Sequence, residues 1–188
     1  MGDPRKFKNK FSKPKKMLDK TRIGEESALK RSFGLKNMRE LWIAVAELKK
    51  ARREARRLLS LTETERKKEE HIVLSKLQRL AILDSKARID DVLSLTVKDV
   101  LERRLQTRVV RKGLAKSMAQ SRQLITHGFI AVGERKVNIP SYLVTQAEDE
   151  SIRHYKKIEI DQKPAVVQVP VQPKPIDAAA AKPQQAKV

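Results

Sequence analysis

The chain has 188 residues, a formal net charge of +20 and no cysteine. Such a charge repels itself in the folded state, so we expect a polyanionic partner, with nucleic acid favoured over an anionic membrane surface. The lack of cysteine excludes disulfides, cysteine-ligated zinc and thiol catalysis.

The first 20 residues are predicted to form an extended basic arm, because cations outnumber acids and Pro4 and Pro14 interrupt the segment. No apolar stretch follows these charges, and no apolar run in the chain approaches the ~20 residues that span a bilayer. We therefore expect no membrane partner and a cytoplasmic location. The aromatic residues Phe7 and Phe11 favour an RNA-binding arm over a solvated tail. The arm cations expected to bind RNA are Arg5, Lys6, Lys8 and Lys10.

Residues 21–93 are predicted to form a helical domain. From Leu41 to Leu61 the apolar residues recur at helical spacing and share one face, on which only Arg52 is charged. The opposite face carries a basic ridge expected to bind RNA, made of Lys49, Arg53, Arg56 and Arg57 beside Lys50. Thr62 and Glu65 have the spacing of a capping box that opens a second helix. A short helix is expected near residues 89–93.

Residues 94–160 are predicted to form a second unit, of mixed type. Thr96 is the expected N-cap of a helix over residues 97–107. Ser117 and Gln120 form a second capping box, opening a helix that Gly128 ends in the left-handed conformation. Alternation at residues 130–132 and 137–139 then predicts two strands joined by a turn at 133–136, with a third strand starting near Ile152 and continuing through Ile158 and Ile160.

Cations gather in this second unit. We expect them to converge at an exposed concave edge and to bind phosphate, with an ordinary charged surface as the alternative. They are Arg103, Arg104, Arg108, Lys112, Lys116, Arg122, Arg135 and Lys136, with His127 beside them.

Residues 161–188 contain five of the eight prolines and no periodic apolar face, so a disordered tail is predicted there.

The segment from Ser117 to Gly128, followed by a short hairpin, resembles the small RNA-binding module named after ribosomal protein S-four. The residues that match the module's pattern are Ser117, Arg122, Leu124, Ile125, Gly128 and Val132. Met118 replaces the arginine usual at its position, and Gly133-Glu134 replaces Asn-Gly. The resemblance implies an α+β fold: a helical domain, then helices packed on a small antiparallel sheet, then the tail.

Four other segments resemble the archaeal and eukaryotic branch of the ribosomal protein itself. They are residues 1–6, 33–42, 101–107 and 137–142. The resemblance implies a primary binder of small-subunit ribosomal RNA in the subunit body. It implies a place near the side where messenger RNA enters and near the region that controls translational accuracy. The implied protein partner is a neighbour of the S-five family, with messenger RNA as a further contact.

Catalysis is not expected. His71, His127 and His154 are isolated in the sequence, and the acidic runs Asp90-Asp91 and Glu148-Asp149-Glu150 are interpreted as solvated, with a helix start as the alternative for the first pair. No glycine-rich phosphate loop is present, so no cofactor or metal is expected. The two rival interpretations are an RNA-modifying enzyme that carries the same module and a general nucleic-acid compaction protein.

Overall fold

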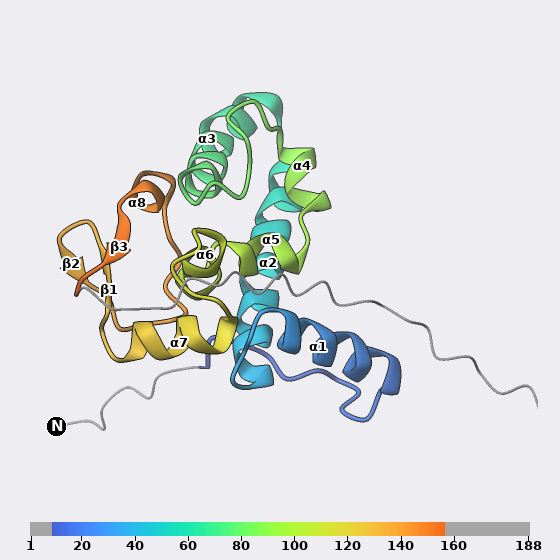
Figure 1. Ribbon diagram of the computed structural model, residues 1–188. Coiled ribbons are helices and arrows are strands. Elements are labelled where there is room, and N and C mark those ends of the chain that lie inside the picture. The colour runs from blue at the N-terminus through green and yellow to red at the C-terminus, as the bar shows by residue number, and fades with distance from the viewer. Residues whose placement is uncertain (1–8, 157–188) are drawn as a thin grey trace, which may run out of the picture.

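The computed structural model of the chain describes residues 9–156, and Figure 1 shows how its elements are arranged. The expectations for Arg5, Lys6 and Lys8, for the tail at 161–188 and for the strand residues Ile158 and Ile160 fall outside the described residues. Within them, helices dominate and a small antiparallel sheet follows late in the chain, which confirms the α+β class. None of the described helices is both long and apolar enough to cross a membrane.

The first part of the described chain is helical. Its elements are α1 (Lys20–Ser32), α2 (Met38–Leu59), α3 (Glu63–Arg79), α4 (Ile89–Ser94) and α5 (Val97–Glu102). Figure 1 shows α2 running through the middle of the molecule, with α1 beside its start and α3 and α4 near its far end.

The long helix α2 has the amphipathic pattern that the sequence predicts. Its apolar side is buried, while the basic ridge on the opposite side is exposed. The buried residues are Leu41, Ala44, Leu48, Ala55 and Leu58. Burying each leucine side chain contributes about 1.5–3 kcal/mol to folding. This favours packing the other helices around the apolar side of α2. Arg52, the one charge in the stripe, donates from its guanidinium to the carbonyl of Leu95.

The start of α3 differs from expectation. Thr62 precedes the helix, but its hydroxyl donates to the Glu65 carboxylate (3.0 Å) and caps no backbone N–H. The predicted capping box is therefore wrong. The apolar pattern runs to Leu83, yet α3 ends at Arg79 because Ala81 adopts a left-handed φ of 48°. The Arg103 guanidinium donates from Nε (2.9 Å) and Nη2 (2.5 Å) to the Ala81 carbonyl, which holds this turn in place.

The helix expected over 97–107 is split in two. Helix α5 ends at Glu102 and α6 (Leu105–Arg111) begins after an extended residue, Arg104. The chain at residues 140–144 causes the break. The N–H of Leu105 donates to the Tyr142 carbonyl (2.7 Å), and the N–H of Val144 donates to the Arg103 carbonyl (3.0 Å). These distant backbone partners replace the bonds of a continuous helix.

Helix α7 (Met118–Thr126) lies where the sequence predicts it. The Ser117 hydroxyl accepts from the N–H of Gln120 (3.2 Å), as expected of an N-cap. The Gln120 amide oxygen, however, accepts from the N–H of Lys116 (2.7 Å), so only half of the predicted box forms. Gly128 ends the helix at φ 73°, and the N–H of Phe129 donates to the Leu124 carbonyl (2.9 Å). This confirms the glycine C-terminal cap.

The sheet contains β1 (Ile130–Val132), β2 (Arg135–Lys136) and β3 (Ile152–His154) in the antiparallel order β2-β1-β3. Val132 pairs with Arg135, so the turn is Gly133-Glu134 alone. The expected turn over 133–136 and second strand at 137–139 are therefore wrong by two residues. A short helix, α8 (Gln146–Glu150), precedes β3 and was not expected.

Two buried apolar clusters hold these elements together. The first joins α2 to α3, α4 and α5; the second joins α6 and α7 to the sheet. Leu95, Val100 and Leu101 pack in the first cluster, whereas Leu105 is the earliest residue of the second. The expected domain boundary at residues 93/94 stays a prediction, because packing alone does not show which segments fold independently.

Candidate nucleic-acid interface

Two cations of the expected binding edge converge on Glu40, in the first turn of α2. Arg104 Nη2 lies 2.6 Å from Glu40 Oε2, and Arg122 Nη2 lies 2.8 Å from Glu40 Oε1. The side chain of Arg104 is only 7% exposed and that of Arg122 is 26% exposed. The expectation of an exposed edge is wrong for Arg104, whereas Arg122 is half-buried and lines the groove described below. Their charges are committed to a carboxylate inside the protein.

Burial alone would raise the pKa of Glu40. The hydrogen bond from Arg122 and the charges of Arg104 and Arg122 outweigh it, and the pKa of Glu40 is lowered. Burial also lowers the pKa of Arg104, against the charge of Glu40. The carboxylate is therefore ionised at neutral pH and neutralises part of the positive charge between α2 and α7.

Gln106 completes this junction and is fully buried. Its amide nitrogen donates to the carbonyls of Gly34 (3.0 Å) and Met118 (2.9 Å), and its amide oxygen accepts from Arg122 Nη1 (3.3 Å). The side chain thus links the α1–α2 turn, α6 and α7. A buried amide with these partners satisfied fixes the geometry of the junction.

A second group of expected binding cations converges on Asp149 of α8. Arg108 forms a two-pronged pair with this carboxylate, with Nε 2.9 Å from Oδ1. Arg103 Nη1 lies 3.8 Å from Oδ2, and the Lys112 ammonium donates to the Asp149 carbonyl. The interpretation of Glu148-Asp149-Glu150 as solvated acids is therefore wrong for Asp149. Arg111, nearby, pairs with Glu102 (2.7 Å).

A groove of about 760 Å³ lies between α1, the α1–α2 turn and α7. Its lining includes four cations and no carboxylate: Lys30, Arg31, Lys36 and Arg122. Lys30, Arg31 and Lys36 form no ion pair with any described residue, and Arg31 and Lys36 are exposed. We call these three residues the groove cations. Their charge is available to an anion outside the protein.

The basic ridge of α2 is exposed as predicted. Lys49, Arg53 and Arg56 are exposed and pair with no carboxylate among the described residues, whereas Arg57 pairs with Glu69 of α3. Three of the four expected binding residues of this ridge thus have free charge.

Exposed basic residues also flank α7 and lie on the sheet. They are Lys116, His127, Arg135 and Lys136, and none forms an ion pair within residues 9–156. Lys10 is exposed at the start of the described chain, where the adjacent Phe11 packs on Trp42 with ring centroids 5.8 Å apart. The arm is therefore anchored on the helical part at Phe11.

The sequence missed the groove cations. Two lie in the last turn of α1 and one in the turn before α2, and nothing in their local pattern marks them. Only the packing of α7 against α2, through Arg122 and Glu40, places them opposite a second basic wall.

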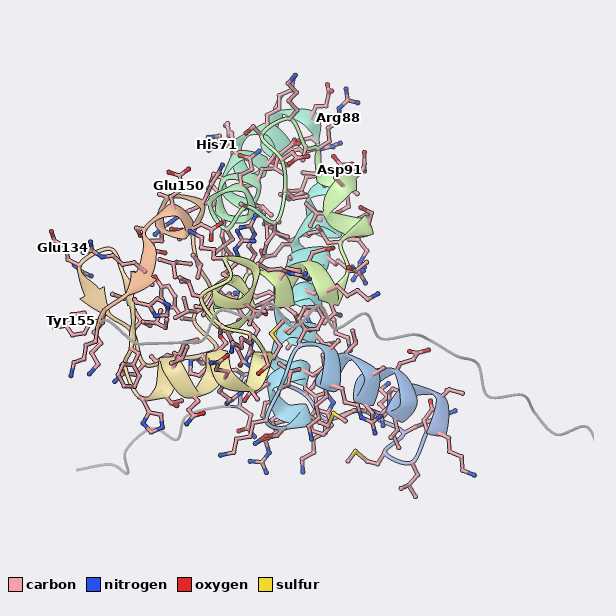
Figure 2. The ribbon with its side chains drawn as sticks, viewed as in Figure 1. His71, Arg88, Asp91, Glu134, Glu150 and Tyr155 are labelled. Atoms are coloured by element: carbon pink, nitrogen blue, oxygen red, sulfur yellow. The ribbon has the colours of Figure 1, made fainter. Side chains whose placement is uncertain are left out.

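Among the described residues, no three His, Asp or Glu side chains lie close enough to hold a metal ion. Figure 2 shows His71 on α3, far from Glu134 at the hairpin.

Comparison with known proteins agrees with this architecture. Residues 103–151, which contain α6, α7 and most of the sheet, match the S4 domain family. Small ribosomal subunit protein uS4 of Ignicoccus hospitalis is 51% identical over 152 residues, which cover 81% of this chain and 92% of that protein. The protein of the same name from Sulfolobus acidocaldarius is 44% identical over 87% of this chain and 94% of its own length. The protein of the same name from Methanoregula boonei is 48% identical over 84% of this chain and 88% of its own length.

An S4 domain packed against a basic helical unit places the chain in the class of S4-domain proteins. The chain belongs to the uS4 family of small ribosomal subunit proteins and is similar to archaeal members. Both the predicted family and the prediction of a non-enzyme are confirmed.

Proposed function

We propose that the chain is a structural constituent of the small ribosomal subunit and binds its ribosomal RNA. Three facts support this: membership of the uS4 family, a net charge of +20, and an S4 domain whose surface carries unpaired cations. Each phosphate that meets such a cation releases condensed counterions, which supplies sequence-independent affinity.

The groove between α1 and α7 is the observation that carries the proposal. It has basic residues on both walls, Lys30 and Arg31 on α1 and Arg122 on α7, and no acid in its lining. Glu40 and Gln106 hold the Arg122 side chain in place on the α7 wall of the groove. A basic groove selects a phosphate backbone by shape, since A-form RNA offers side chains little else to read in its deep major groove.

The finer part of the proposal rests on the family. It assigns the chain a primary place in assembling the subunit body, near the side where messenger RNA enters and near the region that controls accuracy. A neighbour of the S-five family and messenger RNA are the further proposed contacts, and the cytoplasm is the proposed location. Family membership supports these statements.

The test is selective binding. The full chain is titrated against a folded junction of small-subunit ribosomal RNA and against a large-subunit fragment of equal length, at a salt concentration that suppresses non-specific binding. We expect at least ~1,000-fold tighter binding to the small-subunit junction, at the lower end of the specificity range of nucleic-acid-binding proteins. Equal affinity for both RNAs would overturn the proposal in favour of general nucleic-acid compaction.

A further inference from the structure

The three-stranded sheet has a face opposite the one on which the buried residues Ile130, Val132 and Ile152 of the second apolar cluster lie. Side chains alternate along a strand, and Ile130, Val132 and Ile152 all pack in that cluster on the inner face. Ala131 pairs with Lys136 on one side and with Arg153 on the other. Lys136 and Arg153 therefore stand on the outer face, on either side of Ala131.

Tyr155 extends this outer face. Its N–H donates to the Phe129 carbonyl (2.8 Å), which continues the ladder between β3 and β1 by one residue pair. Since it follows Arg153 by two residues, its side chain stands on the same face. Tyr155 is 54% exposed, whereas the other Phe, Tyr and Trp side chains among residues 9–156 are buried or half-buried. Figure 2 shows it at the outer edge of the sheet, away from the helices.

The cations on this face, and the one that follows Tyr155 in the chain, form no internal ion pair in the described part of the chain. Lys136, Arg153 and Lys156 are exposed, and none of them pairs with a carboxylate in residues 9–156. The Lys136 side chain passes beside Gly128, where the Cβ of any larger residue would meet Lys136 Nζ at 2.6 Å and Asn138 Oδ1 at 3.0 Å. Lys136 and Asn138 are thus neighbours at one end of the outer face.

We propose that this outer face, made of Lys136, Asn138, Arg153 and Tyr155, binds an unpaired RNA nucleotide. The base stacks on the Tyr155 ring, and the two cations meet the phosphates on either side of it. Stacking on an exposed ring tolerates any base, because every base has a π-face. A duplex keeps its bases stacked inside and cannot use the ring. The inference rests on the proposed function and adds that the contacted RNA includes an unpaired position.

The test compares Tyr155→Leu with Tyr155→Phe in the full chain. The probes are a labelled adenosine homopolymer of about ten nucleotides and a labelled RNA duplex of the same length, followed by fluorescence anisotropy. We expect Tyr155→Leu to bind the single strand about 5- to 100-fold more weakly, the range of one lost stacking contact. Tyr155→Phe keeps the ring and is expected to stay within about 2-fold of the parent, as is binding of every variant to the duplex.

Ile72→Ala is the matched control, since Ile72 is an exposed apolar residue (66%) on α3, away from the sheet. It is expected to leave both affinities unchanged. Unchanged single-strand binding by Tyr155→Leu, or an equal loss on the duplex, would overturn the inference. This test can fail independently of the selectivity test. The effect of Tyr155→Leu is measured on a homopolymer, so it does not depend on whether the chain prefers small-subunit RNA.

Discussion

Arg122 of α7 and Glu40 of α2 are 82 residues apart in the sequence, yet Arg122 Nη2 lies 2.8 Å from Glu40 Oε1. Arg104 shares the same carboxylate from the start of α6. One acidic residue therefore joins the helical part to the S4 domain, and it pairs with two arginines that the sequence alone assigns to RNA.

Replacing Glu40 with Gln is expected to destabilise the protein by about 2–4 kcal/mol, because it leaves the buried guanidinium of Arg104 without a counter-charge. Urea unfolding measures the change. Glu54→Gln is the control, since Glu54 pairs with Lys50 at 3.9 Å on an exposed surface, and we expect a loss below about 0.5 kcal/mol. Equal losses in the two variants would show that the Glu40 junction contributes nothing particular.

The same residue gives a pH dependence. Burial acts to raise the pKa of Glu40, but its arginine partners lower it overall, from an ordinary value of 4.5. A carboxyl with a lower pKa in the folded state stabilises fully above the unfolded value, and this contribution is lost as pH falls through the folded one. We therefore expect the parent protein to lose stability more steeply than Glu40→Gln below pH ~4.5. Parallel curves of unfolding free energy against pH would contradict this.

Ala81→Gly is expected to stabilise the protein by about 0.5–1 kcal/mol. A left-handed alanine costs about 1–2 kcal/mol, and the extra chain entropy of glycine offsets part of the gain. Thermal unfolding measures it. A destabilisation of about 1 kcal/mol would contradict this, because it would show that the left-handed conformation of Ala81 costs less than the chain entropy that glycine adds.

Gly113 and Gly128 share a φ of 73°, which makes them a matched pair. A Cβ at Gly113 meets nothing within 4 Å, whereas one at Gly128 meets Lys136 Cε at 1.9 Å. The flexible end of a lysine moves aside at little cost, so both alanine variants are expected to lose a similar ~1–2 kcal/mol. A loss at Gly128 more than about 2 kcal/mol larger would show that Lys136 is held rigidly.

The sequence predicts those elements whose signals are local. The apolar stripe of α2, the Ser117 N-cap and the Gly128 cap each depend on residues within a few turns of one another, and each is found. The break between α5 and α6 is not local. It depends on hydrogen bonds to the Tyr142 carbonyl and from the Val144 N–H, about 40 residues away along the chain, that no helical periodicity encodes.

The candidate site shows the same limit. A count of cations in residues 98–136 finds a basic segment, but it does not show that Glu40 and Asp149, from outside that segment, take up Arg104, Arg108 and Arg122. The groove cations do not stand out in the sequence. Their role appears only in the folded protein, where α7 lies opposite α1. Which charges are free is a property of the tertiary packing.

The central claim is that RNA phosphates are met by cations with no internal ion pair, the groove cations above all. It is tested by the slope of log affinity against log salt on the small-subunit RNA junction. Changing Lys30, Arg31 and Lys36 to Gln is expected to reduce the slope by about 2–3, close to one unit per lost phosphate contact. Changing Arg57, Arg108 and Arg111 to Gln removes the same charge from residues paired with Glu69, Asp149 and Glu102, and is expected to leave the slope unchanged. An unchanged slope in the groove variant, or an equal reduction in both, would contradict the account.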